Sequence, residues 1–152
     1  MSMTIETGGC QCGAVRYDIR GALPPAYCCH CGECKKQSAS AFSFSIPLSF
    51  SRLAVVGQPA MLRTEGFSGA VKDCYFCGKC GTRLWHRSGA APDNATLKVG
   101  TLDEPDGIAP AFHLWTSKKA GWVMLDPAVP AFETQPEDLL AMREEMSRRK
   151  PA

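Results

Sequence analysis

Nine cysteines give this 152-residue sequence most of its chemical potential. Four of them, with a histidine, crowd into CCHCGEC at 28–34, and two shorter pairs stand at CQC (10–12) and CGKC (77–80). An odd number fits a disulfide framework poorly, and the N-terminus lacks the basic head and apolar stretch of a secretory signal. Metal binding is therefore the favoured role. The nine are Cys10, Cys12, Cys28, Cys29, Cys31, Cys34, Cys74, Cys77 and Cys80.

Cys77 and Cys80 have the spacing of half a tetrahedral zinc site, because a tight turn aims both thiolates at one point. Either CQC or the 28–34 cluster can supply the other half. If CQC does, one zinc gains four thiolates and ties two distant segments together, which is a structural role. Three thiolates then remain in 29–34. Three protein ligands and one free position are the pattern of a zinc that binds something else.

Two neighbours can close that second site instead. Cys28 or His30 would supply a fourth ligand, but residues adjacent to a ligand seldom reach the same ion without strain, so the spacing favours an open site. An iron–sulfur reading starts from Cys74, which makes CxxCxxC with the CGKC pair, but Leu84 stands where a ferredoxin run has its next cysteine. We interpret Cys28 and Cys74 as small apolar side chains near the sites.

Short alternating segments, separated by glycine and proline, must position these cysteines. Val15, Tyr17 and Ile19 alternate with polar residues, which predicts a half-buried strand over 13–21. Many such segments predict a mainly β, single-domain fold built from short antiparallel strands. The predicted strands cover 13–21, 41–47, 53–57, 60–66, 70–76, 82–87 and 96–100.

One helix is predicted, in the tail at 136–150. Leu139, Met142 and Met146 would share a face there, acidic residues open the segment and basic residues close it. The pattern favours a packing role for this C-terminal helix.

Composition excludes several classes of partner. The chain is 45% hydrophobic and 21% charged, as in ordinary globular proteins, and its net charge of +2 is scattered. We therefore expect no nucleic-acid partner. No run of 18 apolar residues occurs, which predicts no transmembrane helix. We expect a cytoplasmic protein.

Four motifs, in the same order, resemble the glutathione-dependent formaldehyde-activating enzyme family: GGCQCGAVRY, CCHCGEC, YFCGKCGT and PAFHLWTSKKAGW. The resemblance covers residues 8–132 and leaves 133–152 as a tail. It implies an all-β fold of the β-tent kind. It also implies a structural zinc on Cys10, Cys12, Cys77 and Cys80, and a catalytic zinc on Cys29, Cys31 and Cys34.

The resemblance further implies a carbon–sulfur lyase that joins a small thiol, glutathione or a similar one, to a small aldehyde such as formaldehyde. A zinc with three thiolates can accept a fourth thiolate, and the adduct with a carbonyl is a hemithioacetal. Two departures concern the substrate. Lys35 stands where the family commonly has arginine, and Gly121 stands where it usually has proline. Lysine keeps the charge but loses the bidentate fork that grips a carboxylate.

Neighbouring side chains have weaker signals. Lys35 and Lys36 are candidates to offset the negative charge of three thiolates, and Trp115 and Lys119 are candidates to line a pocket. His113 fits a satisfied strand histidine better than a base, and His86 indicates no role.

Two other functions use the same residues. A thiol carrier would hold glutathione without turnover, and a structural zinc domain would act through protein contacts. The latter requires the 29–34 cluster to be closed or empty.

Overall fold

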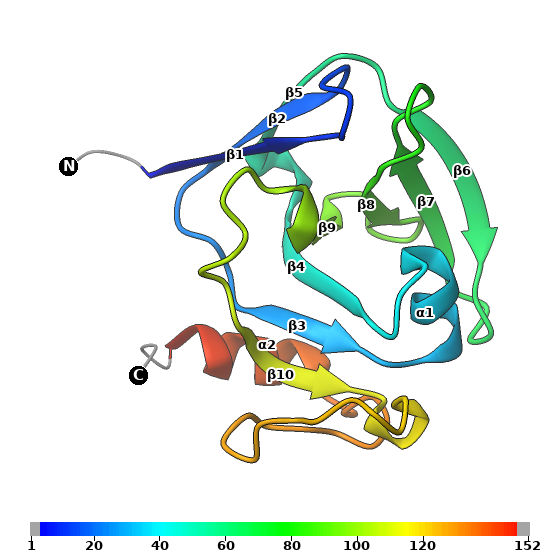
Figure 1. The fold of residues 1–152 in the computed structure, drawn as a ribbon, viewed down its shortest axis with the longest axis vertical. Coiled ribbons are helices and arrows are strands. Elements are labelled where there is room, and N and C mark those ends of the chain that lie inside the picture. The colour runs from blue at the N-terminus through cyan, green and yellow to red at the C-terminus, as the bar shows by residue number, and fades with distance from the viewer. Residues whose placement is uncertain (1–3, 149–152) are drawn as a thin grey trace. The chain divides into compact units, whose positions relative to one another are not determined.

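The computed structural model describes residues 4–148, which form two compact bodies (Figure 1). The first body contains the chain up to residue 23 together with 46–107, and the second contains 24–45 together with the chain from 108 onward. Each body contains one group of cysteines. Those of CQC and CGKC belong to the first body, and those of 29–34 to the second.

The first body is made of strands. They are β1 (Ile5–Gly9), β2 (Arg16–Arg20), β5 (Leu53–Val56), β6 (Ala60–Glu65), β7 (Val71–Phe76), β8 (Arg83–Ser88), β9 (Asn94–Lys98) and the end of β4 (Ser43–Ser49), with 3-10 turns η1 (Phe50–Arg52) and η2 (Val99–Thr101). One antiparallel sheet has the order β1-β2-β5. A second sheet runs β4-β9-β8-β7-β6 in this body. The pairs β6–β7, β7–β8 and β8–β9 are all antiparallel, which confirms the expected mainly β fold of short antiparallel strands.

Alternation along β2 builds the core of the first body. Tyr17 and Ile19 are buried as predicted, and Val15 is buried just before the strand. The Tyr17 ring meets Trp85 edge-on, with centroids 6.1 Å apart, and Tyr75 stacks on the same indole at 5.7 Å. Aromatic pairs of this geometry add to the burial of their area. The core thus holds β2, β7 and β8, which flank the two cysteine turns of this body.

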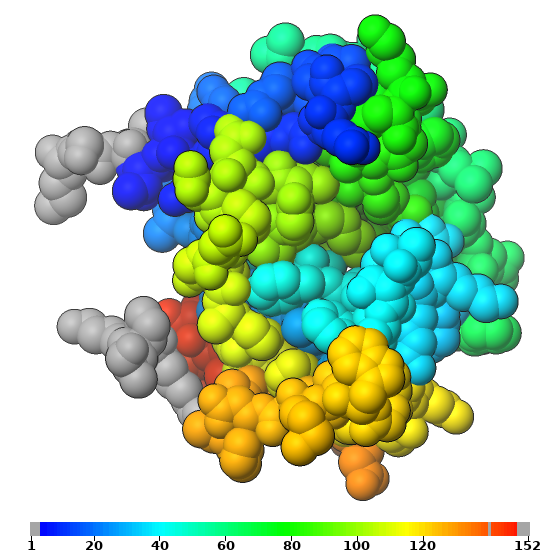
Figure 2. All heavy atoms as spheres, viewed as in Figure 1, coloured from blue at the N-terminus to red at the C-terminus, as the bar shows by residue number. Residues whose placement is uncertain are grey.

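The second body combines strands with two helices. Its elements are β3 (Ala26–Cys29), α1 (Gly32–Ser38), the start of β4, β10 (Pro110–Leu114), the 3-10 turn η3 (Thr116–Lys118) and α2 (Leu139–Arg148). The sheet order is β10-β3-β4. The β3–β4 pair is antiparallel, whereas β10 pairs with β3 in parallel. Figure 2 shows the segment after β10, in yellow to orange, lying against the cyan α1 segment.

Helix α2 covers the apolar centre of this body. Leu139, Met142 and Met146 all pack against the buried cluster of Tyr27, Cys29, Phe112 and Leu114. Figure 1 shows the helix running beside β3 and β10. Asp138 caps its start, since the Asp138 carboxylate accepts the Ala141 N–H at 2.9 Å. The expected helical face is confirmed over the described residues; positions 149 and 150 of the predicted span lie outside them.

Several elements were not predicted. The sequence patterns did not predict strands β1, β3 and β10 or helix α1; the C-terminal helix is confirmed as α2, but it is not the one helix of the chain. The seven residues of α1 include no buried side chain and so carry no apolar period. Strand β3 is buried at every position, which removes the alternation that identifies a half-exposed strand.

Candidate metal centres

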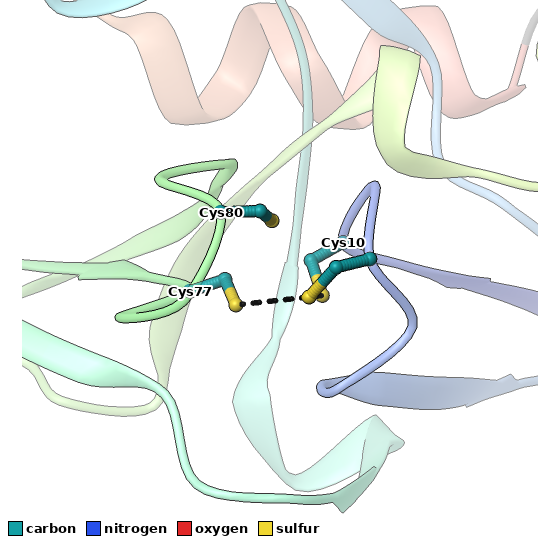
Figure 3. Close-up of side chains that lie close together, drawn as sticks. Cys10, Cys77 and Cys80 are labelled. Carbon is teal, nitrogen blue, oxygen red and sulfur yellow. Dashed lines mark hydrogen bonds between the residues drawn. The ribbon is translucent and has the colours of Figure 1, made fainter.

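The four-cysteine group, Cys10, Cys12, Cys77 and Cys80, lies in the first body. Cys10 and Cys12 follow β1, and Cys77 and Cys80 lie between β7 and β8. Their four sulfur atoms all lie within 4.8 Å of one another. The Cys12 sulfur is 3.6 Å from that of Cys10 and 3.7 Å from that of Cys77. Figure 3 shows Cys77 and Cys80 on one loop, facing Cys10 on the other.

Each pair is presented by a tight turn that ends in glycine. The Gly13 N–H donates to the Cys10 carbonyl at 3.1 Å, and the Gly81 N–H donates to the Cys77 carbonyl at 2.8 Å. Both glycines have φ of +79°. This left-handed backbone suits glycine because it has no Cβ. A glycine therefore follows each cysteine pair because the turn that directs the two thiols toward the other pair needs a left-handed residue at that position.

Hydrogen bonds join the two loops of this group. The Thr82 hydroxyl accepts the Gln11 N–H at 3.1 Å and lies 3.2 Å from the Cys80 sulfur. That hydroxyl and the Thr82 backbone lower the pKa of Cys80 to about 5. The Val15 N–H donates to the Cys10 sulfur at 3.3 Å. These donors favour thiolates, the form in which cysteine binds metal.

The three-cysteine group, Cys29, Cys31 and Cys34, lies in the second body. Cys29 ends β3, Cys31 is the N-cap of α1, and Cys34 lies in the first turn of that helix. The three sulfur atoms lie within 4.8 Å of one another. The Cys31 sulfur accepts the Cys34 N–H at 3.4 Å. Strand end and helix start thus bring together three thiols from six residues.

Both groups fit a thiophilic metal ion. In the second body the thiols of Cys31 and Cys34, together with burial, raise the pKa of Cys29 well above its usual range. Three thiolates packed this closely repel one another, and a bound cation is what normally holds such a set together. Sulfur-only donor sets of three or four are those that zinc favours.

No fourth ligand of the usual kinds joins the three-cysteine group. Among residues 4–148, no further cysteine, histidine or carboxylate places a ligand atom within 4.8 Å of all three sulfurs. Cys28 is buried on β3 and pairs in register with His113. Burial raises the pKa of Cys28 to about 12. The group therefore has the composition expected of an open site.

His30 points into the core rather than joining the sulfurs. Its ring is fully buried, and its Nε2 lies 3.1 Å from Nδ1 of His113. Burial lowers the pKa of His30 to about 4, with smaller effects from His113, Lys119 and Lys35, and burial also lowers the pKa of His113. Both rings are therefore neutral near pH 7.

Basic and aromatic residues surround the second group. Trp115 packs against the cluster that contains Cys29 and adopts a left-handed φ of +58°. The Lys35 ammonium donates to the Lys118 carbonyl, which ties α1 to η3. The Lys119 ammonium donates to the Val123 carbonyl at 2.8 Å. The Lys35 bond holds the segment after β10 beside the helix that carries Cys34, and the Lys119 bond closes a turn within that segment.

The remaining cysteine and histidine stand apart from both groups. Cys74 is buried on β7, where it pairs in register with His86. Its sulfur lies 3.6 Å from the Thr64 hydroxyl, and it is not a member of the four-cysteine group. The spacing CxxCxxC therefore contains one pair of clustered thiols and one separate thiol.

Comparison with known families gives a match over residues 5–118 to the model described as glutathione-dependent formaldehyde-activating enzyme. The chain belongs to this family. The matched region includes all nine cysteines, and the residues of the last motif beyond 118 lie outside it. Family membership confirms the resemblance and agrees with two cysteine groups suited to metal; it leaves the reaction of this member open to proposal.

A solved structure has a related fold. The match to the crystal structure of a Rhodobacter sphaeroides protein covers 82% of this chain and 98% of the other chain, with a TM-score of 0.51 and 19% sequence identity. At this identity the likeness concerns the fold alone. Within residues 4–148, no helix is both long and apolar enough to cross a membrane.

Proposed function

We propose that the protein is a zinc-dependent carbon–sulfur lyase that forms and cleaves adducts between a small thiol and a small aldehyde. The observation that carries the proposal is the group of three clustered thiols, joined by no fourth ligand of the usual kinds among residues 4–148. The family name points to glutathione and formaldehyde as the reacting pair. The four-cysteine group is assigned a structural zinc, which gives two ions per chain.

Cys29, Cys31 and Cys34 would hold the catalytic ion. When bound, zinc would stabilise an incoming thiol as its thiolate and supply positive charge for a carbonyl oxygen. In the forward direction the thiol S–H bond breaks, a carbon–sulfur bond forms, and the proton ends on the former carbonyl oxygen. The reverse reaction cleaves the same carbon–sulfur bond. Neither direction requires an oxidant or a reductant.

The residues around the group have separate tasks in this proposal. Lys35 and Lys119 would supply positive charge to offset three thiolates; both act on the neighbouring His30, whose pKa is lowered chiefly by burial and slightly by these lysines. Trp115 packs on the Cys29 cluster and would shield one side from water. Lys35 offers one ammonium rather than a guanidinium fork, so it would hold a substrate carboxylate with less directional control.

Cobalt substitution tests the proposal. Sulfur-to-cobalt charge-transfer bands report bound thiolates, so titration with glutathione should raise the absorbance to saturation. Cys31→Ser should lose most of this response, while Cys74→Ser, which changes a thiol outside both groups, should keep it. Formaldehyde-dependent turnover, followed by the loss of free aldehyde, then tests catalysis.

Two results would contradict the enzyme. An unchanged spectrum with glutathione and other small thiols would mean that the site is closed, and the protein would be a zinc-stabilised interaction domain. A saturating spectral change without turnover would indicate a thiol carrier.

A further inference from the structure

His30 occupies an unusual place, because it separates two of the three clustered thiols in the sequence. Its side chain is fully buried, while Cys31 on one side of it is half-buried. The imidazole packs on Phe42, with ring centroids 5.2 Å apart, and bonds to His113 through Nε2. His30 therefore turns inward where its two neighbours contribute to the sulfur group.

We propose that the His30–His113 pair is a positioning device that keeps Cys29 and Cys31 directed at one metal ion. The inference rests on the proposed function, since it requires a metal on the three-cysteine group. His113 is a member of neither sulfur group, and it is buried on β10, away from a substrate in solution. It acts through His30 alone.

Two hydrogen bonds to β10 fix His30, the residue between Cys29 and Cys31. The His30 N–H donates to the Leu114 carbonyl at 3.0 Å, and the His30 ring bonds to the ring of His113, which precedes Leu114 on that strand. In the parallel pairing, Cys29 stands opposite Leu114. Because consecutive side chains of an extended segment point to opposite sides, a ring held inward directs both adjacent thiols to the other side.

The contact between the two rings needs one donor and one acceptor. Across the 3.1 Å between Nε2 of His30 and Nδ1 of His113, one nitrogen carries the proton and the other accepts it, whichever tautomer is present. The bond is therefore lost when the side chain at position 113 has neither a donor nor an acceptor.

This requirement defines the matched variants. His113→Asn can place an amide oxygen or an amide nitrogen where Nδ1 lies, whereas His113→Leu fills space without a donor or an acceptor. His86→Leu is the control, because it changes the histidine of the other body. Each variant is stripped of metal and titrated with cobalt, and the two groups are followed by their charge-transfer bands.

The expected result is a selective loss of affinity. His113→Leu should weaken cobalt binding at the three-cysteine group roughly 10- to 100-fold and shift its charge-transfer band, the usual scale for losing a contact that orients ligands. His113→Asn should restore the wild-type band and most of the affinity. Binding at the four-cysteine group should stay unchanged in all variants. A His113→Leu protein with wild-type affinity and spectrum overturns the proposal.

The controls separate this inference from the proposed function. Wild-type protein that binds only one cobalt overturns both, whereas two ions in wild type and unchanged binding in His113→Leu overturn the positioning role alone. Should His113→Leu fail to fold, His113→Phe takes its place, because its ring fills the site of the imidazole without a nitrogen, and the same outcomes decide.

Discussion

Two glycine turns bring four thiols together in the first body, whereas a strand end and a helix start bring three together in the second. In the first case the chain makes the same type of closure twice, with left-handed Gly13 and Gly81 each following a cysteine pair. In the second case one continuous stretch of six residues supplies every thiol. The four-cysteine group therefore closes a long loop of chain, and the three-cysteine group closes almost none.

This difference separates stabilisation from reactivity. Joining residues 10–12 to 77–80 through a metal restricts the unfolded chain and adds binding free energy to folding. A metal on 29–34 constrains a segment that β3 and α1 already order, so its loss should affect the fold less. Four thiolates also complete a tetrahedral shell, while three leave a coordination position for a ligand from solution.

The largest expected effect comes from removing a ligand of each group. Cys77→Ser should lower the free energy of unfolding by on the order of 4 kcal/mol or more, because the closing metal is lost. Cys31→Ser should cost only about 1 kcal/mol, for the loss of a half-buried sulfur contact, because the serine hydroxyl can still cap the helix. Thermal and denaturant melts, with zinc counted in each variant, measure both.

Cys74→Ala is the control, since it truncates a buried cysteine of the first body without removing a ligand. It should keep both zinc ions and cost about 1 kcal/mol. Equal losses from Cys77→Ser and Cys31→Ser would show that both metals support the fold and would erase the proposed division of roles.

The turns give the next largest contrast. Gly81→Ala forces a Cβ into a backbone with φ of +79° and should cost about 1–2 kcal/mol, although no atom lies within 4 Å of that Cβ. Gly32→Ala places the same Cβ at the start of α1, in equally open space, and should be neutral or stabilise by up to about 1 kcal/mol. Melts of the two variants at saturating zinc provide the comparison. A cost at Gly32 as large as that at Gly81 would mean that the left-handed backbone of Gly81 does not set the cost of the substitution.

Spacing predicted half of a metal site at Cys77 and Cys80 but left CQC and the 28–34 cluster as alternative partners, and the full division was implied only by the family resemblance. Turns such as CGKC-Gly fix the direction of their thiols within five residues, so no distant contact is needed to recognise half a site. The strand at 13–21 was predictable for the same reason, as alternation is a local property of the chain. In that segment the buried positions Tyr17 and Ile19 match the predicted pattern.

The features that the sequence did not predict depend on contacts between residues that are distant along the chain. The His30–His113 bond joins positions 83 apart, and only the parallel register of β3 and β10 brings them together. The sequence leaves His30 as a candidate fourth ligand, because its position between two cysteines does not reveal the direction of its ring. Helix α1 is ordered by the Cys31 cap and by the Lys35 bond to Lys118, neither of which leaves a periodic pattern.

A smaller effect is expected from the packing of α2 on the second body. Met142 packs against the cluster that contains Cys29, so Met142→Ala should cost about 1–2 kcal/mol and loosen cobalt binding at the three-cysteine group. Binding at the four-cysteine group should not change. Exposed Glu144 on the same helix gives the control, with Glu144→Ala expected within about 0.5 kcal/mol of wild type. A spectral change at the four-cysteine group instead would contradict the separation of the two centres.

The smallest effect concerns the carboxylate that braces β1 and β2, the strands on either side of the CQC turn. Hydrogen bonds from Arg16 and then Thr7 lower the pKa of Asp103 to about 2, whereas an unfolded aspartate titrates near 3.9. A lowered folded pKa contributes stability above about pH 4, and that contribution disappears as the pH falls toward 2.

Asp103→Asn should therefore be slightly less stable than wild type at pH 5 and equal to it near pH 2. Denaturant melts of both proteins across this range measure the difference in the free energy of unfolding. Both proteins release metal in acid, so this effect cancels in the comparison. Asp106→Asn, at an exposed position nearby, should run parallel to wild type throughout; a gap for Asp103→Asn that stays constant with pH would show that the aspartate acts through packing and not through its charge.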